Sequence, residues 1–268
     1  EVESRGFAIS AIKTDSLKIV NATKDIIDFC MDFAKKYGYT FEHETTYSKL
    51  FQMNDADYVA KYASDEYCMN EYGYIPSDNA KAGENTWCET GARFAVPYVF
   101  KTLFTHEPYI FDDFCLTKEV SKGNMYLDTN EGLTPQPDVD EEISRRELNA
   151  RIEENGLKTK PKKLNPSFDS ISLDALKDIS AKTHSYHFVG RIGEFCPIKP
   201  GCGGGLLMCN RNGKYNNVTG TKGYRWLESE TVRNLNKAND VDTSYFISLV
   251  NEAKDAIMKY GDFEWFVS

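Results

Sequence analysis

The stretch GFAISAIKTDSLKIV, residues 6–20, decides the fold of the first part of this chain. Apolar residues alternate on both sides of Lys13-Thr14-Asp15-Ser16, which predicts two short antiparallel strands joined by a tight turn. An aspartate on such a hairpin can bind a hard cation such as Mg2+, which prefers oxygen ligands. Such a turn is more often structural only, because Asp and Ser side chains commonly bond the local backbone.

The composition limits the classes of protein. The chain has 268 residues, of which 41% are hydrophobic, enough for one large or two small domains. The net charge of −9 excludes a surface that is basic all over, so nucleic acid would meet a local stripe of Lys and Arg. Seven irregularly spaced cysteines and no leader-like segment predict reduced thiols in a cytoplasmic protein. No apolar run is long enough to predict a membrane span.

Outward from the hairpin, an amphipathic helix is predicted from Asn21 or Thr23 to about Tyr37, with Gly38 as its stop. Strands are predicted next, and polar residues with little periodicity then indicate a surface loop. Apolar segments around two prolines predict short helices. The predicted strands cover residues 39–44, 49–53 and 58–62, the loop covers 64–84, and the short helices fall within 94–120.

The second half of the chain begins with a proline-containing acidic linker at residues 130–140. Apolar stripes at helical spacing predict several helices after it. The turn Asn210-Arg211-Asn212-Gly213 predicts a β-hairpin. The predicted helices cover residues 141–155, 173–182, 224–235 and 244–260, and the predicted strands cover 186–192, 206–209 and 215–218.

Three further segments invite chemical interpretations. His184, His187, Cys196, Cys202 and Cys209 could form a zinc site, but no close Cys-x2-Cys pair is present, which favours inert side chains. The glycines at 201–205 match neither phosphate-binding pattern and favour a turn between strands. The basic run LKTKPKK, residues 157–163, is interpreted as a solvated loop, with phosphate contact as the alternative.

The order strand, Lys13-Thr14-Asp15-Ser16, strand, helix, followed by FEHETTYSKLFQMNDADYVAKYA, resembles the carboxyl-terminal half of the palm of family B DNA polymerases. The segments WCETGARFAVPYVFKTLF, HFVGRIGEFCPIKPGCGGG and TGTKGYRWLESETV look like downstream parts of phage and viral members. The resemblance implies an α+β fold with a small antiparallel palm-like sheet and packed helix. A mostly helical thumb-like region containing a small β subdomain would follow.

This resemblance implies five segments. They are a palm-like segment with the Asp15 turn (1–63), a loop and helical thumb-like region (64–140), a charged helix and basic linker (141–182), a small β subdomain (183–222) and carboxyl-terminal helices (223–268).

The resemblance also implies roles for single residues. Asp15 matches the catalytic aspartate that binds metal, with Thr14 and Ser16 as its neighbours, whereas Lys13 stands where the family has another aspartate. Tyr58 matches the tyrosine of a Lys-x-Tyr element beside the primer-template, but Ala56 replaces the lysine, and Lys61 is a candidate to substitute. Further candidates for contact with the DNA backbone are Lys101, Arg191, Lys199, Lys222 and the basic residues of 158–163.

The family's Asp-x-x-Ser-Leu-Tyr-Pro and Lys-x3-Asn-Ser-x-Tyr-Gly motifs, which precede the Asp15 turn, are not in this sequence. The chain therefore looks like the carboxyl-terminal portion of a DNA-directed DNA polymerase. Asp15 would be its one ligand to a two-metal Mg2+ site, and the second carboxylate would come from outside this chain. The expected partners are primer-template DNA, deoxynucleoside triphosphates and the amino-terminal part of the polymerase.

Three other functions fit the same residues. The chain could be a non-catalytic module that clamps primer-template, or a structural protein of a phage particle. It could also be a metal nuclease that uses Asp15 with Glu42 or Glu44. Salt-steep DNA affinity would separate the first of these from the second, and Mg2+-dependent cleavage by the isolated chain would reveal the third.

Overall fold

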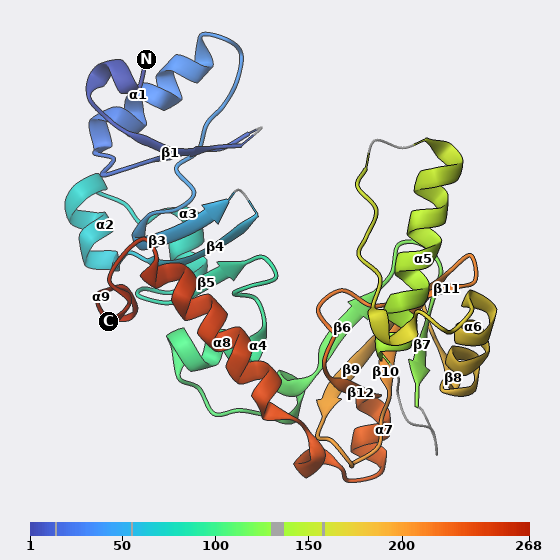
Figure 1. Ribbon diagram of the computed structural model, residues 1–268. Coiled ribbons are helices and arrows are strands. Elements are labelled where there is room, and N and C mark those ends of the chain that lie inside the picture. Colours follow the sequence, from blue (N-terminus) through green and yellow to red (C-terminus); the bar gives the residue numbers. More distant parts are fainter. Residues whose placement is uncertain (14, 55, 130–136, 157–158) are drawn as a thin grey trace. The chain divides into compact units, whose positions relative to one another are not determined.

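The computed structural model describes residues 1–13, 15–54, 56–129, 137–156 and 159–268. The chain divides into two compact units (Figure 1). Unit 1 comprises Glu1–Asp113 and Phe246–Ser268, and unit 2 comprises Phe114–Tyr245. Both units combine helices with small antiparallel sheets, which confirms the predicted α+β class. No helix within the described residues is long and apolar enough to cross a bilayer.

Unit 1 contains a two-stranded sheet, β1-β2, and a three-stranded sheet in the order β3-β4-β5. Its strands are β1 (Ile9–Ile12), β2 (Leu17–Ile19), β3 (Tyr47–Asn54), β4 (Asp57–Tyr62) and β5 (Trp87–Thr90). Its helices are α1 (Lys24–Lys35), α2 (Asp65–Tyr72), α3 (Ser77–Ala82), α4 (Pro97–Phe100), most of α8 (Thr243–Met258) and α9 (Phe263–Val267). A π-helical turn at Lys101–Thr105 continues α4, and 3-10 turns occupy Glu3–Arg5 and Phe111–Phe114.

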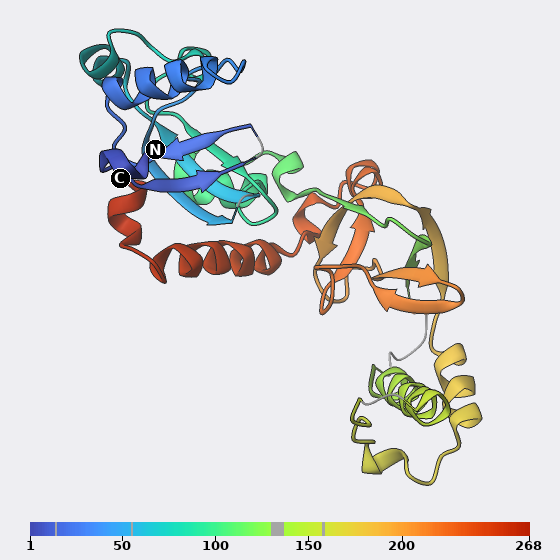
Figure 2. The same ribbon diagram turned by 90° about the horizontal axis from the view of Figure 1, so that it is seen from above.

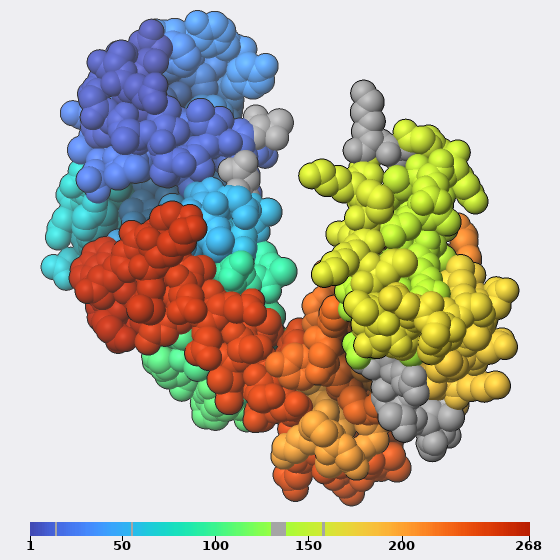
Figure 3. Space-filling view, viewed as in Figure 1, coloured from blue at the N-terminus to red at the C-terminus, as the bar shows by residue number. Residues whose placement is uncertain are grey.

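The end of the chain completes the core of unit 1. Ala253 and Ile257 of α8 and Phe266 of α9 pack with Val59 of β4 and with Phe94 in one buried cluster. Figure 3 shows this carboxyl-terminal segment, in red, lying against the cyan and green segments of the same unit. Burying this many aromatic and aliphatic side chains contributes more than any polar contact in the unit.

Most elements near the start follow the sequence predictions. The hairpin, α1, β3 and β4 are confirmed. The strand predicted at 39–44 is wrong, because residues 39–46 have no regular structure. The backbone there bonds elsewhere: the carbonyl oxygen of Glu44 accepts from the amide of Asp78, 2.9 Å away, so no strand ladder forms.

The loop predicted at 64–84 is also wrong, because it contains α2 and α3. Ser64 caps α2 by accepting a hydrogen bond from the amide of Tyr67. Cys68 and Tyr72, four residues apart, are both buried on the inner side of this helix. The polar composition of the segment concealed this narrow apolar stripe.

Asn79 of α3 is fully buried and joins two parts of unit 1. Its side chain accepts from the amide of Thr46 and donates to the carbonyl oxygens of Thr46 and Ala63, at 2.8, 2.9 and 3.3 Å. Asn79→Ala is expected to lower the free energy of unfolding by about 1–3 kcal/mol, since buried backbone groups lose their partners. Urea unfolding would measure this, with exposed Asn70→Ala as a control expected to change it by under about 0.5 kcal/mol. Equal effects of the two changes would contradict the role given to Asn79.

Unit 2 contains two antiparallel sheets, ordered β11-β10-β7-β8 and β12-β9-β6. The strands are β6 (Leu116–Glu119), β7 (Asn124–Asp128), β8 (Tyr186–Gly190), β9 (Ile192–Ile198), β10 (Leu206–Arg211), β11 (Lys214–Asn217) and β12 (Arg225–Glu228). The helices are α5 (Pro137–Asn155), α6 (Leu173–Lys182) and α7 (Ser229–Asn234), with 3-10 turns at Pro166–Phe168 and Ala238–Asp240.

The β10-β11 hairpin is confirmed, and its turn residues Asn212 and Gly213 both have positive φ, as a mirror-image turn requires. The glycine-rich turn before β10 is confirmed as well. A Cβ on Gly204 would lie 2.6 Å from the carbonyl oxygen of Trp226, and one on Gly205 would lie 2.7 Å from that of Asp128. These two glycines therefore allow neighbouring strands to approach closely.

Four strands of unit 2, β6, β7, β9 and β12, were predicted wrongly or missed. The helix predicted at 224–235 begins instead as β12, which pairs with β9 and buries Trp226 completely, and only α7 is helical. The short helices predicted up to residue 120 end before β6, which also pairs with β9. Neither β7 nor β9 was predicted from the sequence, since the strand predicted at 186–192 corresponds to β8. Regions expected to be helical therefore contain strands, because pairing partners far along the chain decide these short segments.

The α5–α6 pair is inserted between β7 and β8, and Figure 2 shows the two helices side by side. The helices predicted at 141–155 and 173–182 are confirmed, with α5 starting earlier, at Pro137. The remainder of the predicted linker, 130–136, and residues 157–158 of the basic run lie outside the described residues.

Candidate functional site

The β1-β2 hairpin presents Asp15. Ile12 pairs with Leu17, and the amide of Lys13 donates to the carbonyl oxygen of Ser16 at 2.9 Å, which closes the turn. The side chains of Lys13, Asp15 and Ser16 are exposed, whereas Thr14 lies outside the described residues. The aspartate predicted from sequence therefore stands on an exposed tight turn between two antiparallel strands.

The helix behind the hairpin holds it in place. Ile26 and Ile27 of α1 are buried against a set of apolar side chains that includes Ile9 and Leu17. The guanidinium of Arg5 lies 3.6 Å from the centre of the Phe29 ring, which ties the start of the chain to the same helix. These contacts restrict the hairpin and so restrict where Asp15 can point.

Asp15 is the carboxylate that the sequence analysis predicts as a metal ligand, and its side chain is exposed. Among the residues that the structure describes, no three His, Cys, Asp or Glu side chains are grouped as metal ligands. Glu42 and Glu44, the nuclease candidates, are exposed on the irregular segment 39–46. One exposed carboxylate fits a single ligand of Mg2+, which usually takes only one or two protein carboxylates.

Two predicted DNA-binding residues lie on β4. The ammonium of Lys18, from β2, lies 4.3 Å from the centre of the Tyr58 ring, so this tyrosine connects the hairpin with the larger sheet. The Lys61 ammonium donates to the carbonyl oxygen of Ser268 at 3.0 Å and lies 5.6 Å from the Trp87 ring. Lys61 thus helps to hold the end of the described chain against the sheet.

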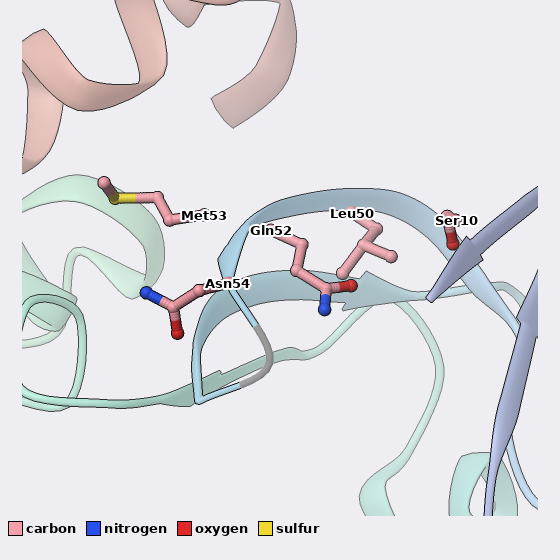
Figure 4. Close-up of a pocket in the computed structure, with 5 residues that line it drawn as sticks. All are labelled: Ser10, Leu50, Gln52, Met53 and Asn54. Carbon is pink, nitrogen blue, oxygen red and sulfur yellow. The ribbon is translucent and has the colours of Figure 1, made fainter. Parts of the chain in front are cut away.

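A shallow hollow of about 350 Å3 lies beside the hairpin (Figure 4). Ser10 of β1 and four residues of β3 line it, and sequence reasoning did not identify them. The four are Leu50, Gln52, Met53 and Asn54. The side-chain oxygen of Gln52 is buried and accepts no hydrogen bond from any described residue. β1 and β3 belong to different sheets, so only tertiary packing brings Ser10 next to the β3 residues.

Lys101 takes part in a largely buried ion pair. Its ammonium lies 2.9 Å from a carboxylate oxygen of Asp113 and 3.4 Å from the carbonyl oxygen of Pro108. Only 17% of the Lys101 side chain is exposed. This geometry gives Lys101 a structural role in closing the segment after the π-helical turn.

The remaining predicted cations lie in unit 2, and those within the described residues are exposed: Arg191, Lys199, Lys222 and, in the basic run, Lys160, Lys162 and Lys163. Arg191 donates to the carbonyl oxygen of Ser121 at 2.6 Å, and Lys199 donates to that of Asn239 at 2.7 Å. Lys222 lies between Thr221 and Gly223, just before β12. Asp15 belongs to unit 1 and these cations belong to unit 2, so they are described as two separate sets.

The histidine and cysteine residues of the zinc hypothesis have other contacts. Cys196 lies 3.4 Å from Cys115, sulfur to sulfur, and both are buried. The thiol of Cys209 donates to the carbonyl oxygen of Lys122. The hydrogen bond with Cys115, together with burial, raises the pKa of the Cys196 thiol. A thiol with a raised pKa is a poor nucleophile and a poor metal ligand at neutral pH.

His184 is enclosed by acids at the junction of the α5–α6 insertion and the sheet. Its Nδ1 contacts Asp128 of β7, and its Nε2 lies 3.2 Å from a carboxylate oxygen of Asp140 of α5. The hydrogen bonds with Asp128 and then Asp140 raise the pKa of His184 to about 9, against the opposing effect of burial. Burial favours a higher pKa for Asp140, but hydrogen bonds from His184 and Ser180 lower it.

This network predicts a pH dependence of stability. Because the folded pKa of His184 lies above its ordinary value of 6.5, its contribution is fully present below about pH 6.5 and is lost as pH rises to about 9. The free energy of unfolding is therefore expected to fall more steeply across this range in the parent than in His184→Gln. Urea unfolding at several pH values would measure this, with exposed His187→Gln as the control. A parent and a His184→Gln variant with equal slopes would contradict the prediction.

Comparison of the chain with models of protein families, with curated proteins and with solved structures gave no match. The geometry of the two units and the chemistry of their residues are therefore the basis for a functional proposal.

Proposed function

We propose that this chain is the carboxyl-terminal portion of a DNA-directed DNA polymerase that resembles the phage and viral members of family B. Residues 1–63 would form the second half of the palm, and the following regions would form the thumb. The observation that carries this proposal is the exposed Asp15 at the end of an antiparallel hairpin backed by α1. That is the arrangement expected of an aspartate that binds the catalytic metal.

The task of this chain at the reaction centre is to position one carboxylate. Bound Mg2+ supplies the charge that favours attack of a primer 3'-hydroxyl on the α-phosphate of a nucleotide. The closed turn between Lys13 and Ser16 holds the Asp15 side chain on the outside of the hairpin. A short, packed hairpin varies little in position, and catalysis of this kind depends mainly on positioning.

Lys13 changes the local charge of the proposed site. Its ammonium stands two residues from Asp15, where the family has a second acid, so this turn attracts cations less than a two-aspartate turn would. A second carboxylate from outside this chain then completes the two-metal site. This supports a division of the catalytic acids between this chain and the amino-terminal part of the polymerase.

The primer-template and the incoming deoxynucleoside triphosphate are the proposed substrates. Tyr58 is connected to the Asp15 hairpin through Lys18, which supports a place for it beside the primer. Lys61 would have to exchange its bond with the Ser268 carbonyl for a phosphate contact. Arg191, Lys199 and Lys222 are exposed and are proposed to contact the DNA backbone at sites away from the hairpin.

Primer extension by the full-length protein in Mg2+ tests this proposal, with Asp15→Asn compared with the parent.

A specific observation also favours a second candidate function, a non-catalytic module that grips primer-template. Among the described residues, no group of three or more His, Cys, Asp or Glu side chains is arranged to hold a metal ion. Such a module would bind duplex DNA with a steep salt dependence and without extension, whereas a structural phage protein would show no salt-steep DNA affinity.

A further inference from the structure

One face of the β11-β10-β7-β8 sheet carries a cluster of four aromatic side chains, which we call the aromatic face. It consists of Tyr126 of β7, Tyr186 and Phe188 of β8, and Tyr215 of β11. The Tyr126 ring lies edge-on to Phe188 and Tyr215, with centroids 5.6 and 5.5 Å apart. Tyr186 and Tyr215, from strands at opposite edges of the sheet, stack in parallel at 3.7 Å, and Tyr186 also stacks on His184 at 5.2 Å (strands labelled in Figure 1). Phe188 is therefore the ring of this cluster that is left exposed.

This aromatic face is accessible. Phe188 is 64% exposed, and the three tyrosines are half-buried. Phe188 therefore presents its ring to solvent at the edge of a cluster of partly buried tyrosines. Aromatic rings on the open face of a small sheet are the platforms on which unpaired nucleic-acid bases stack.

Four cations gather at one end of the same sheet, which we call the basic end. Lys122 and Arg191 flank the start of β7 and the end of β8, and Arg211 and Lys214 flank the β10-β11 turn. All four are exposed. At about 3.3 Å per strand residue, Lys122 and Arg191 lie within roughly 13 Å of Tyr126 and Phe188.

The basic end is oriented by the backbone. Arg191 donates a hydrogen bond to the carbonyl oxygen of Ser121 at 2.6 Å. Nε of Arg211 donates to the carbonyl oxygen of Lys122 at 3.2 Å. Each guanidinium has five N–H donors, so these bonds orient it without using its full capacity. Most of the acidic excess of the chain belongs to unit 1, while acids and bases nearly balance in unit 2.

Arg211 pairs with Lys214 next to the Asn210–Tyr215 pair, so these two cations point to the face opposite Tyr215 and meet a strand at the end of the sheet. The end of the sheet therefore supplies cations suited to phosphates beside an exposed ring.

We propose that the aromatic face and the basic end together bind single-stranded nucleic acid. Bases stack on Phe188 and the neighbouring rings, and the basic end contacts the phosphates. Stacking makes this binding tolerant of sequence, because every base has a π-face. This binding goes beyond the proposed polymerase function and does not depend on Asp15. If Asp15→Asn shows that the polymerase proposal is wrong, single-strand binding by the aromatic face is still tested by its own experiment, and the reverse also holds.

Fluorescence anisotropy with a labelled 20-residue oligothymidylate tests this inference, using the whole chain at several salt concentrations. Phe188→Ala is expected to weaken binding by about 5- to 150-fold, the effect of losing one stacked base, and Phe188→Trp is expected to restore it. The matched control is Ile192→Ala on β9, since Ile192 is 63% exposed and lies outside the aromatic face. Its affinity is expected to equal that of the parent.

Two further arms separate stacking from charge. An abasic oligonucleotide of the same length is expected to bind the parent and Phe188→Ala equally, because it has phosphates but no bases to stack. The double change Lys122→Ala with Lys214→Ala is expected to lower the slope of log affinity against log salt by about 1.4, at roughly 0.7 per phosphate contact on a single strand. Oligouridylate in place of oligothymidylate distinguishes RNA from DNA as the source of the strand.

Several results would overturn the inference. Equal losses in Phe188→Ala and Ile192→Ala would show that the aromatic face does not stack bases. Tighter binding of duplex than of single strand, or no binding at low salt, would exclude a single-strand surface. An acidic peptide could instead displace the oligonucleotide. If Phe188→Ala weakens binding of that peptide but not of the oligonucleotide, the aromatic face belongs to a protein partner.

Discussion

Asp15→Asn in the full-length protein is expected to reduce primer extension by about 1000-fold or more while leaving duplex binding unchanged. A catalytic metal ion supplies several kcal/mol of transition-state stabilisation, and each 1.36 kcal/mol corresponds to a tenfold change in rate. An amide in place of the carboxylate removes the charge that holds Mg2+. Single-turnover extension of a labelled primer in saturating nucleotide measures the loss, and electrophoretic binding to the same primer-template measures the affinity.

Asp255→Asn provides the matched control for this experiment. Asp255 is an exposed carboxylate on α8 of the same unit, so the same charge is removed at a place away from the hairpin. Extension by this variant is expected to equal that of the parent. Because Asp15 is exposed, neither change is expected to shift the thermal midpoint. Extension by Asp15→Asn at the parent's rate would contradict the polymerase proposal. Salt-steep duplex binding without extension by the parent would favour the clamp module.

Arg146→Ala in α5 is expected to lower the stability of the α5–α6 insertion by about 3–5 kcal/mol, because it leaves a buried carboxylate without its partner. The Glu142 side chain is fully buried, and its Oε1 lies 2.8 Å from Nε of Arg146. Arg146 also donates to the carbonyl oxygens of Ile171 and Phe168, at 2.6 and 2.8 Å. One guanidinium therefore connects α5 to the segment that leads into α6.

The neighbouring residue provides the control. Arg145 pairs with Glu141 at 2.7 Å through the same i,i+4 spacing, but 62% of the Glu141 side chain is exposed. Arg145→Ala is therefore expected to cost under about 1 kcal/mol. Hydrogen exchange at residues 137–156 and 159–182 measures the local stability even where the sheet of unit 2 stays folded. Similar exchange in the two variants would contradict the structural role given to Arg146.

Elements specified by neighbouring residues were predicted correctly. The hairpin at 6–20 follows from alternation around a turn, α1 from Thr23 and a regular apolar stripe, and the β10-β11 turn from Asn212-Gly213. Each signal acts within a few residues. The interpretation of Asp15 as an exposed turn residue succeeded for the same reason.

Elements that depend on distant partners were not predictable in this way. Trp226 and Leu227 have spacing compatible with a helix, yet pairing with β9 makes this segment a strand. Cys68 and Tyr72 gave too narrow an apolar stripe to identify α2 within a polar segment. In both cases tertiary burial outweighed the weak local preference.

The Asp15 hairpin and the helix after it can be read from local sequence, because they depend on contacts between residues close along the chain. Which charged side chains are paired with one another follows instead from the folding of distant segments against each other. Tertiary folding pairs Lys101 with Asp113, Arg146 with Glu142, and His184 with both Asp128 and Asp140. It also brought Tyr186 and Tyr215 into one aromatic face. The physical reason is that burial and desolvation select the partners of polar and aromatic groups, and burial depends on the whole fold.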